Sequence, residues 1–125
     1  VSVTSVLEAK SAMEVIVAAP TAGSCGVVPG ALLGVGATLD ASEDLLTDAL
    51  LTAGLIGVFI AGGATFAAEE GGCMAECGSA SGMSAAALVV MANGTRQQAL
   101  AAASQALQNS FGMTCVPVAN RVESP

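Results

Sequence analysis

Four cysteines and one loop of small residues are the parts of this sequence that could do chemistry. Cys73 and Cys77 lie four positions apart in a glycine-rich segment that also contains Glu69, Glu70 and Glu76. If this segment is helical, the two thiols face the same side. Thiolates prefer soft metals such as zinc or iron–sulfur clusters, but a buried cysteine can also pack as a small apolar residue. Spacing alone leaves both interpretations open, because no C-x-x-C pair occurs.

The loop from Thr21 to Gly26 could bind an anion. Its small residues can expose consecutive backbone N–H groups, and a helix is expected to begin directly after it. This combination suits a carboxylate or a phosphate, and the hydroxyls of Thr21 and Ser24 could add donors. The alternative is a sharp turn between two helices, in which Ser24 caps the second helix.

The residue types that are missing exclude several classes of protein. The chain contains no histidine, so it cannot form a Ser-His-Asp triad of its own. Lys10 is the only lysine and falls on a predicted helix face, so no pyridoxal phosphate cofactor is expected. The glycines form no phosphate-binding loop with a lysine. A net charge of −7 with three basic residues argues against nucleic acid and against an anionic membrane surface.

The cysteines and the apolar segments indicate a cytoplasmic location without a membrane span. Four cysteines could form two disulfides in a small secreted protein, but the chain lacks the polar, turn-rich character of such scaffolds. Residues 49–68 carry no charge and are long enough to span a bilayer. Because this segment has glycines and no aromatic or basic anchors, we expect a buried central helix instead.

The composition predicts an all-α fold, a compact bundle of about five Ala- and Gly-rich helices with an extended C-terminal tail. Hydrophobic residues make up 54% of the chain and charged residues only 10%; many of the former are alanine, the best helix former. We expect one helical domain over residues 1–125, with apolar area left for another subunit or domain. Ser42 and Thr95 are predicted helix caps. The helices are expected at about 3–17, from just after the loop to about 39 with Pro29 in the first turn, at 43–60, at 73 or 81 to 91, and at 96–110.

Three segments, taken in order along the chain, resemble the iron–sulfur-dependent L-serine dehydratases. Residues 19–30 are similar to that family's A-P-T-A-G-S-x-G-V-V-P-G segment. Residues 71–83 are similar to G-G-C-Q-A-E-x-G-S-A-S-G-M, and residues 112–118 to G-L-x-C-D-P-V. The resemblance spans nearly the whole chain and is strongest to the separate alpha chain of two-subunit enzymes. It implies that this chain is a C-terminal fragment of the catalytic domain.

The resemblance also implies a cofactor and its ligands. In this family a [4Fe–4S] cluster is held by three cysteines, and Cys73 and Cys115 match two of them. The third ligand would come just after Pro125, so the isolated fragment is expected to lack the cluster and to be inactive alone. Cys25 and Cys77 match no ligand position and are expected to pack as small residues.

The implied reaction is a step of amino-acid degradation that supplies gluconeogenesis. A lyase would convert L-serine to pyruvate and ammonia, with L-threonine as a weaker substrate and the cluster as Lewis acid. The resemblance places the substrate carboxylate in the first loop, on Thr21, Ala22, Gly23 and Ser24. Glu69, Glu70 and Glu76 are weak candidates for the catalytic base and could equally be solvated charges.

Partners and alternatives follow from the same resemblance. It implies a beta subunit or regulatory domain and a homo- or hetero-oligomer. Met74 stands where the family has Gln, and Val116 where it has Asp, which leaves the substrate open. One alternative is a related cluster-dependent L-cysteine desulfidase. The other is a non-enzymatic helical packing module, either membrane-embedded or purely structural.

Overall fold

The computed structural model describes residues 2–113, 117–118 and 121–122, and it confirms the all-α fold. Two short strands, β1 (Pro117–Val118) and β2 (Arg121–Val122), pair antiparallel in the described part of the tail. The chain order of the helices is α1 (Ser2–Ser11), α2 (Val27–Leu39), α3 (Glu43–Gly63), α4 (Ala68–Gly71), the π-helical turn η1 (Met74–Gly78), α5 (Ser79–Met91) and α6 (Arg96–Asn109).

Side-chain caps fix the start of two helices, as the sequence predicted. Ser42 Oγ accepts a hydrogen bond from Leu45 N at 3.2 Å, at the start of α3. Thr95 Oγ1 accepts from Gln98 N at 3.3 Å, and Gln98 Oε1 accepts from Thr95 N at 2.7 Å. This reciprocal capping box satisfies two backbone donors at the start of α6.

The first helix is shorter than predicted. We expected it to continue to residue 17, but α1 ends at Ser11, and Met13 follows in the left-handed region with φ 63°. The next residues include the β-branched run Val15, Ile16 and Val17, which has low helix propensity. The chain from residue 12 to residue 19 is therefore irregular and leads back to the start of α2.

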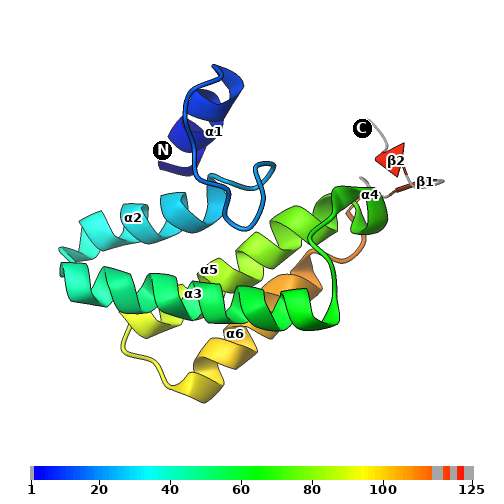
Figure 1. The fold of residues 1–125 in the computed structure, drawn as a ribbon. Helices are drawn as coiled ribbons and strands as arrows, with labels where there is room; N and C mark the ends of the chain where they lie inside the picture. The colour runs from blue at the N-terminus through cyan, green and yellow to red at the C-terminus, as the bar shows by residue number, and fades with distance from the viewer. Residues whose placement is uncertain (1, 114–116, 119–120, 123–125) are drawn as a thin grey trace.

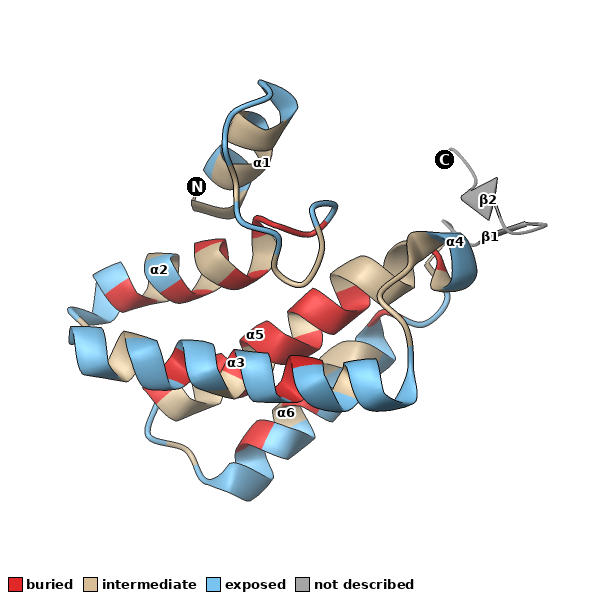
Figure 2. Cartoon of the chain, in the orientation of Figure 1, coloured by how far each residue is buried: buried red, intermediate tan, exposed pale blue. Residues whose placement is uncertain are grey.

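Helix α5 is the centre of the bundle. It packs against α2, α3 and α6, and Figure 1 shows these three helices around it. Figure 2 shows α5 as the most continuously buried element. A Cβ added at Gly82 would lie 3.0 Å from Leu107 Cγ of α6, so the small residue lets the two helices approach closely. The buried residues of α5 are mostly small: Ser79, Ala80, Gly82, Met83, Ser84, Ala86, Ala87 and Met91.

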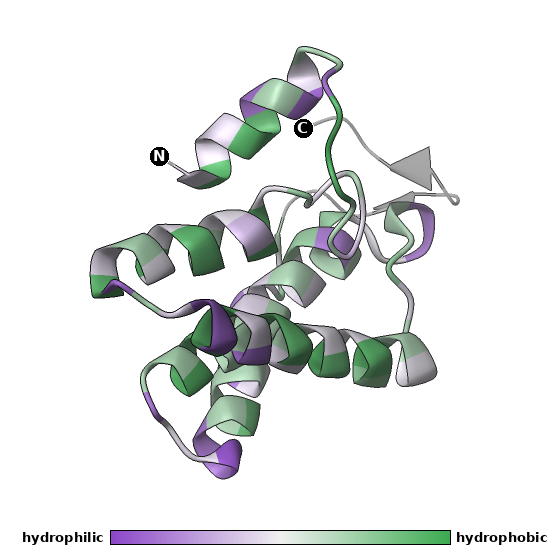
Figure 3. Cartoon of the chain, turned by 60° about the vertical axis from the view of Figure 1, so that its left-hand side comes forward, coloured by the Kyte–Doolittle hydropathy of each residue, from purple (hydrophilic) through white to green (hydrophobic). Residues whose placement is uncertain are grey.

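Helix α3 lies on the surface, so the prediction of a buried central helix over 49–68 is wrong. Its inner stripe is buried at Ala49, Ala53 and Ile56, while Leu51 and Val58 on the outer side are each 67% exposed. Figure 3 shows most of α3 in the colours of apolar residues, with its hydrophilic residues near the N-terminal end. The low charge of the sequence predicted such an uncovered apolar face.

Two helical stretches are long and apolar enough to cross a membrane, judged by length and composition only. One is α3, and the other is the continuous stretch Met74–Met91 that joins η1 to α5. Half of the second stretch is buried inside the bundle, as expected for the core helix of a folded domain. The criterion therefore does not by itself separate a membrane span from a core helix.

Candidate functional site

The loop from Thr21 to Gly26 is held in one shape by its own hydroxyls. Ser24 is 1% exposed, and its Oγ lies 3.1 Å from Thr21 Oγ1 in a hydrogen bond. The backbone N–H of Ser24 also donates to Thr21 Oγ1, at 3.3 Å. Because each hydroxyl has a partner inside the loop, the turn does not depend on a ligand for its shape.

Ser24 does not cap the second helix, so that alternative for the loop is wrong. The N-cap of α2 is Gly26, and no side chain makes a cap hydrogen bond there. Ala22 and Gly23 are exposed, and among the described residues neither of their N–H groups donates a hydrogen bond. The loop therefore has two adjacent backbone donors, in exposed residues just before a helix begins, that make no hydrogen bond within the described part of the chain, as an anion site requires.

Glu76 lies directly against this loop. A Cβ added at Gly23 would lie 2.8 Å from Glu76 Cδ and 2.9 Å from Glu76 Oε1. Both distances are shorter than any normal contact with a Cβ atom, so only glycine fits at position 23 without a shift. Glu76 is half-buried and comes from η1. The structure thus brings together two of the predicted site elements, which the sequence alone could not connect.

The π-helical turn η1 positions Glu76. It runs without interruption into α5, which confirms that the segment around Cys73 and Cys77 is helical. Single π-helical turns inside helices occur frequently at functional sites. Cys73 immediately precedes η1 with helical dihedral angles, φ −59° and ψ −21°. Glu76 follows three positions later, inside the π-helical turn itself.

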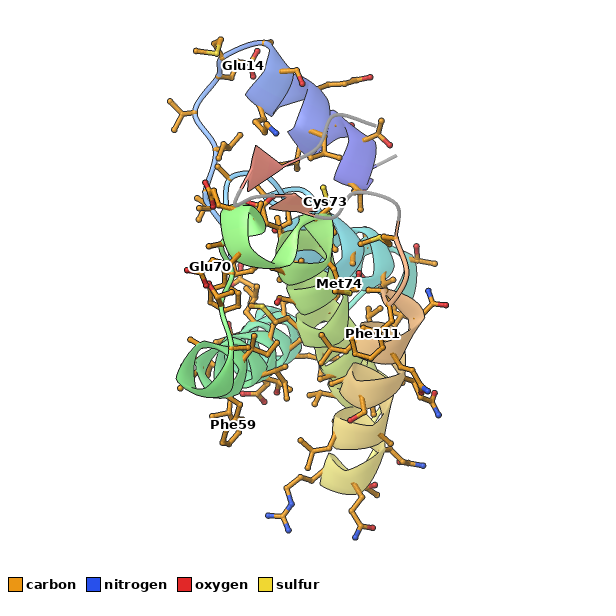
Figure 4. All side chains as sticks on the ribbon, turned by 90° about the vertical axis from the view of Figure 1, so that its right-hand side faces the viewer. Glu14, Phe59, Glu70, Cys73, Met74 and Phe111 are labelled. Carbon is orange, nitrogen blue, oxygen red and sulfur yellow. The ribbon has the colours of Figure 1, made fainter. Side chains whose placement is uncertain are left out.

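The cysteines differ in how deeply they are buried. Cys25 is 0% exposed, which confirms the prediction that it packs as a small residue. Cys73 and Cys77 are half-buried, and Figure 4 shows Cys73 at the end of the bundle near the strands of the tail. Cys115 and the residues after Val122 lie outside the described residues. Within the described residues, no group of three or more His, Cys, Asp or Glu side chains could hold a metal ion.

The segment just before Cys73 contacts the segment that follows Cys115. Helix α4 ends two positions before Cys73, and β1 begins two positions after Cys115. α4 contacts both β1 and β2. A thiol that is not packed in the core, with the flank of a second cysteine beside it, is chemically suited to a cluster ligand.

The other two acidic candidates lie in the first turn of α4. Glu69 and Glu70 are both exposed, and Figure 4 shows Glu70 at the edge of the molecule. Acidic side chains are favourable in the first turn of a helix. Their position suits the interpretation as solvated charges, and their assignment as a base stays a prediction without support from the geometry.

An apolar cavity of about 370 Å³ lies beside η1 but does not include the loop. Met74, Phe59 and Phe111, all labelled in Figure 4, contribute to its wall. Neither Glu76 nor any residue from 21 to 26 lines this cavity. Since it offers almost no polar group, we do not assign it to a charged ligand.

Comparisons with known proteins give one consistent result. Residues 1–125 match the family described as "Serine dehydratase alpha chain". The chain is 48% identical over 118 residues to the "Probable L-serine dehydratase, alpha chain" of Bacillus subtilis strain 168, and 48% identical over 118 residues to the L-serine dehydratase alpha chain of Peptoniphilus asaccharolyticus. It is 36% identical over 111 residues to L-serine dehydratase 1 of Escherichia coli K12. No solved structure matches significantly.

These alignments cover most of this chain but a minor part of each relative. They span 94%, 94% and 88% of this chain, and 39%, 40% and 24% of the three proteins, respectively. The chain thus spans about two fifths of the two alpha chains it matches and a quarter of the longer enzyme.

Proposed function

We propose that this chain, which belongs to the serine dehydratase alpha chain family, forms part of the catalytic centre of an enzyme that deaminates L-serine to pyruvate and ammonia. The observation that carries the proposal is the match over residues 1–125, together with 48% identity to two serine dehydratase alpha chains. Both of these relatives are named as alpha chains, which supports the presence of a second subunit in the enzyme. The rest of the catalytic domain would come from sequence outside these residues, as in the longer relatives.

The loop before α2 would bind the substrate carboxylate. The N–H groups of the exposed residues Ala22 and Gly23 would be the donors, and the hydrogen bonds between Thr21 and Ser24 hold the loop in shape. Bonds from N–H groups to a carboxylate are charge-assisted and stronger than neutral ones. A carboxylate fixed here would orient the α-carbon and the hydroxyl of serine relative to Cys73.

A [4Fe–4S] cluster would be held by Cys73, Cys115 and a third cysteine beyond Pro125, and when bound it would supply a Lewis acid for the departing hydroxyl. The half-buried thiol of Cys73 supports this role, as does the contact of α4 with β1 beside the two cysteines. We also place the enzyme in the cytoplasm, where thiols stay reduced.

The overall reaction balances without an external oxidant or reductant. The substrate loses its α-proton and its hydroxyl as water, and the resulting enamine tautomerises and takes up water to release ammonia and pyruvate. The described residues suggest no group for removal of the α-proton other than Glu76, and the position of Glu76 beside the loop favours a different role.

The test uses the complete alpha chain with its native C-terminal residues, assembled with any partner chain and reconstituted anaerobically with iron and sulfide. We expect thiolate-to-iron absorption and pyruvate release from L-serine. Cys73→Ala and Cys115→Ala should lose both, whereas Cys77→Ala, a matched control from the same segment, should retain both. Sulfide released from L-cysteine without pyruvate from L-serine would favour a desulfidase, and a wild-type protein that binds no cluster would overturn the proposal.

A further inference from the structure

We infer that Glu76 binds the α-ammonium group of the substrate, while the loop at Gly23 binds its α-carboxylate. The pair would then select α-amino acids over α-hydroxy acids of the same size. This inference rests on the proposed function and names the residue that recognises the substrate class. Glu76 is a specificity-determining residue in this account and does not remove the α-proton.

The first support is the position of the Glu76 carboxylate. It lies within contact distance of the Cα atom of Gly23, because a Cβ at that position would be 2.8 Å from Glu76 Cδ. Ala22 and Gly23 are exposed residues, and their N–H groups donate no hydrogen bond among the described residues. A negative group and a pair of hydrogen-bond donors therefore lie side by side at one exposed surface.

The second support is the charge around Glu76. The chain has three basic residues, Lys10, Arg96 and Arg121. Of the two whose side chains the structure describes, Lys10 and Arg96, neither forms an ion pair with Glu76. A half-buried carboxylate that neither of these two side chains neutralises is an attractive site for a cation.

The chemistry of an amino acid fits this arrangement. Its carboxylate and its ammonium group are attached to the same carbon atom, so a small zwitterion can meet the loop donors and Glu76 at once. An α-hydroxy acid carries the same negative charge but no ammonium group. It would place its carboxylate beside that of Glu76 with nothing to compensate the repulsion, and such a repulsive element is an effective source of specificity.

The experiment compares Glu76→Gln with wild type in the assembled, reconstituted enzyme. Glutamine keeps the size of the side chain and its contact with Gly23 but removes the charge. Glu70→Gln is the matched control, because it removes the same charge from an exposed position. We would measure kcat and KM for L-serine, and inhibition by L-alanine, which has both charged groups, and by glycolate, which lacks the ammonium group.

We expect Glu76→Gln to raise the KM for L-serine and the inhibition constant of L-alanine by roughly 10- to 100-fold, the range for one charge-assisted hydrogen bond. Inhibition by glycolate should stay the same or become stronger, since the repulsion is gone. The kcat value should change little, and Glu70→Gln should behave as wild type.

Three results would overturn the inference. A large fall in kcat at unchanged KM would assign Glu76 to proton transfer. Equal losses for L-alanine and glycolate would indicate a structural role, and no change at all would remove Glu76 from the site. If wild type forms no pyruvate, the proposed function fails, and calorimetric binding of L-alanine and glycolate to wild type and Glu76→Gln still decides whether Glu76 recognises the ammonium group.

Discussion

Replacing Gly23 by alanine tests the contact on which the candidate site depends. The added Cβ would lie 2.8 Å from Cδ and 2.9 Å from Oε1 of Glu76, whereas non-bonded carbon atoms rest at about 3.5–4.0 Å. One of the two groups must therefore move by roughly 1 Å. The carboxylate is the end of a flexible side chain, so we expect it to move while the loop keeps its hydrogen bonds. Overpacking costs about 1–3 kcal/mol, and a mobile neighbour predicts the lower end.

Thermal unfolding of residues 1–125, followed by circular dichroism, measures this cost. For a chain of this size, a loss of 1 kcal/mol lowers Tm by roughly 3–5 °C. Gly54→Ala is the matched control. A Cβ at Gly54 meets nothing within 4 Å, and the residue lies inside α3. That substitution should stabilise the protein by about 0.5–1 kcal/mol.

The decisive comparison places Gly23→Ala in a Glu76→Ala background. Without the carboxylate, the new methyl group meets no obstacle from that side chain. Gly23→Ala should then cost much less than it does in the wild type, with a coupling of about 1 kcal/mol between the two positions. An equal fall in Tm in both backgrounds would refute the contact between the loop and Glu76.

Two further predictions concern the bundle. Thr95→Ala should lower the free energy of unfolding by about 1 kcal/mol in urea denaturation, because it removes the side-chain acceptor of the capping box, whereas Thr95→Ser should retain most of the stability. Replacing the exposed Leu51 and Val58 of α3 together by lysine should reduce self-association of the chain in sedimentation velocity. Lysines at the exposed polar positions Gln97 and Gln105 of α6 add the same charge without removing apolar surface, and an equal effect from them would contradict a role of the apolar face.

Local signals in the sequence were sufficient for the fold class and for the capped helix starts. Ser42 and Thr95 each accept a hydrogen bond from a backbone N–H group three residues further on. Their role as helix caps can therefore be predicted without knowledge of the rest of the fold. The end of α1 was missed because apolar spacing favoured a longer helix, while the β-branched residues after Met13 opposed it. Spacing and propensity competed there, and propensity prevailed.

The position of each helix in the bundle could not be predicted from its hydropathy. α3 is more apolar than the stretch Met74–Met91, yet the less apolar helix is at the centre. Alanine and glycine at its contacts, such as Ala80, Gly82 and Ala87, let three neighbours approach it at once. Size at the contacts therefore decided which helix is central, since close approach adds dispersion contacts that bulky side chains would prevent.

The candidate site was predictable by its parts and not by their arrangement. The loop and the acidic, cysteine-containing segment were each recognisable from residue types and from the family resemblance. Nothing in the spacing of Gly23 and Glu76 indicates that they touch, because they are far apart in the sequence. The only local signal was a glycine in a loop that does not need a positive φ there, which points to a close approach by another group.

The π-helical turn allows one continuous helix both to pack in the core and to present side chains at the candidate site. From Ser79 onward the helix buries small residues against α2, α3 and α6. Before that point, Cys73 and Glu76 are half-buried. Cys73 lies toward the tail (Figure 4), and Glu76 lies against the loop at Gly23. A π-helical turn closes its hydrogen bond over one more residue than an α-helical turn, so the side chains before it are rotated relative to the buried face of α5. The same helix can therefore fill the core with alanine and still present the proposed cluster ligand and the proposed ammonium partner at its N-terminal end.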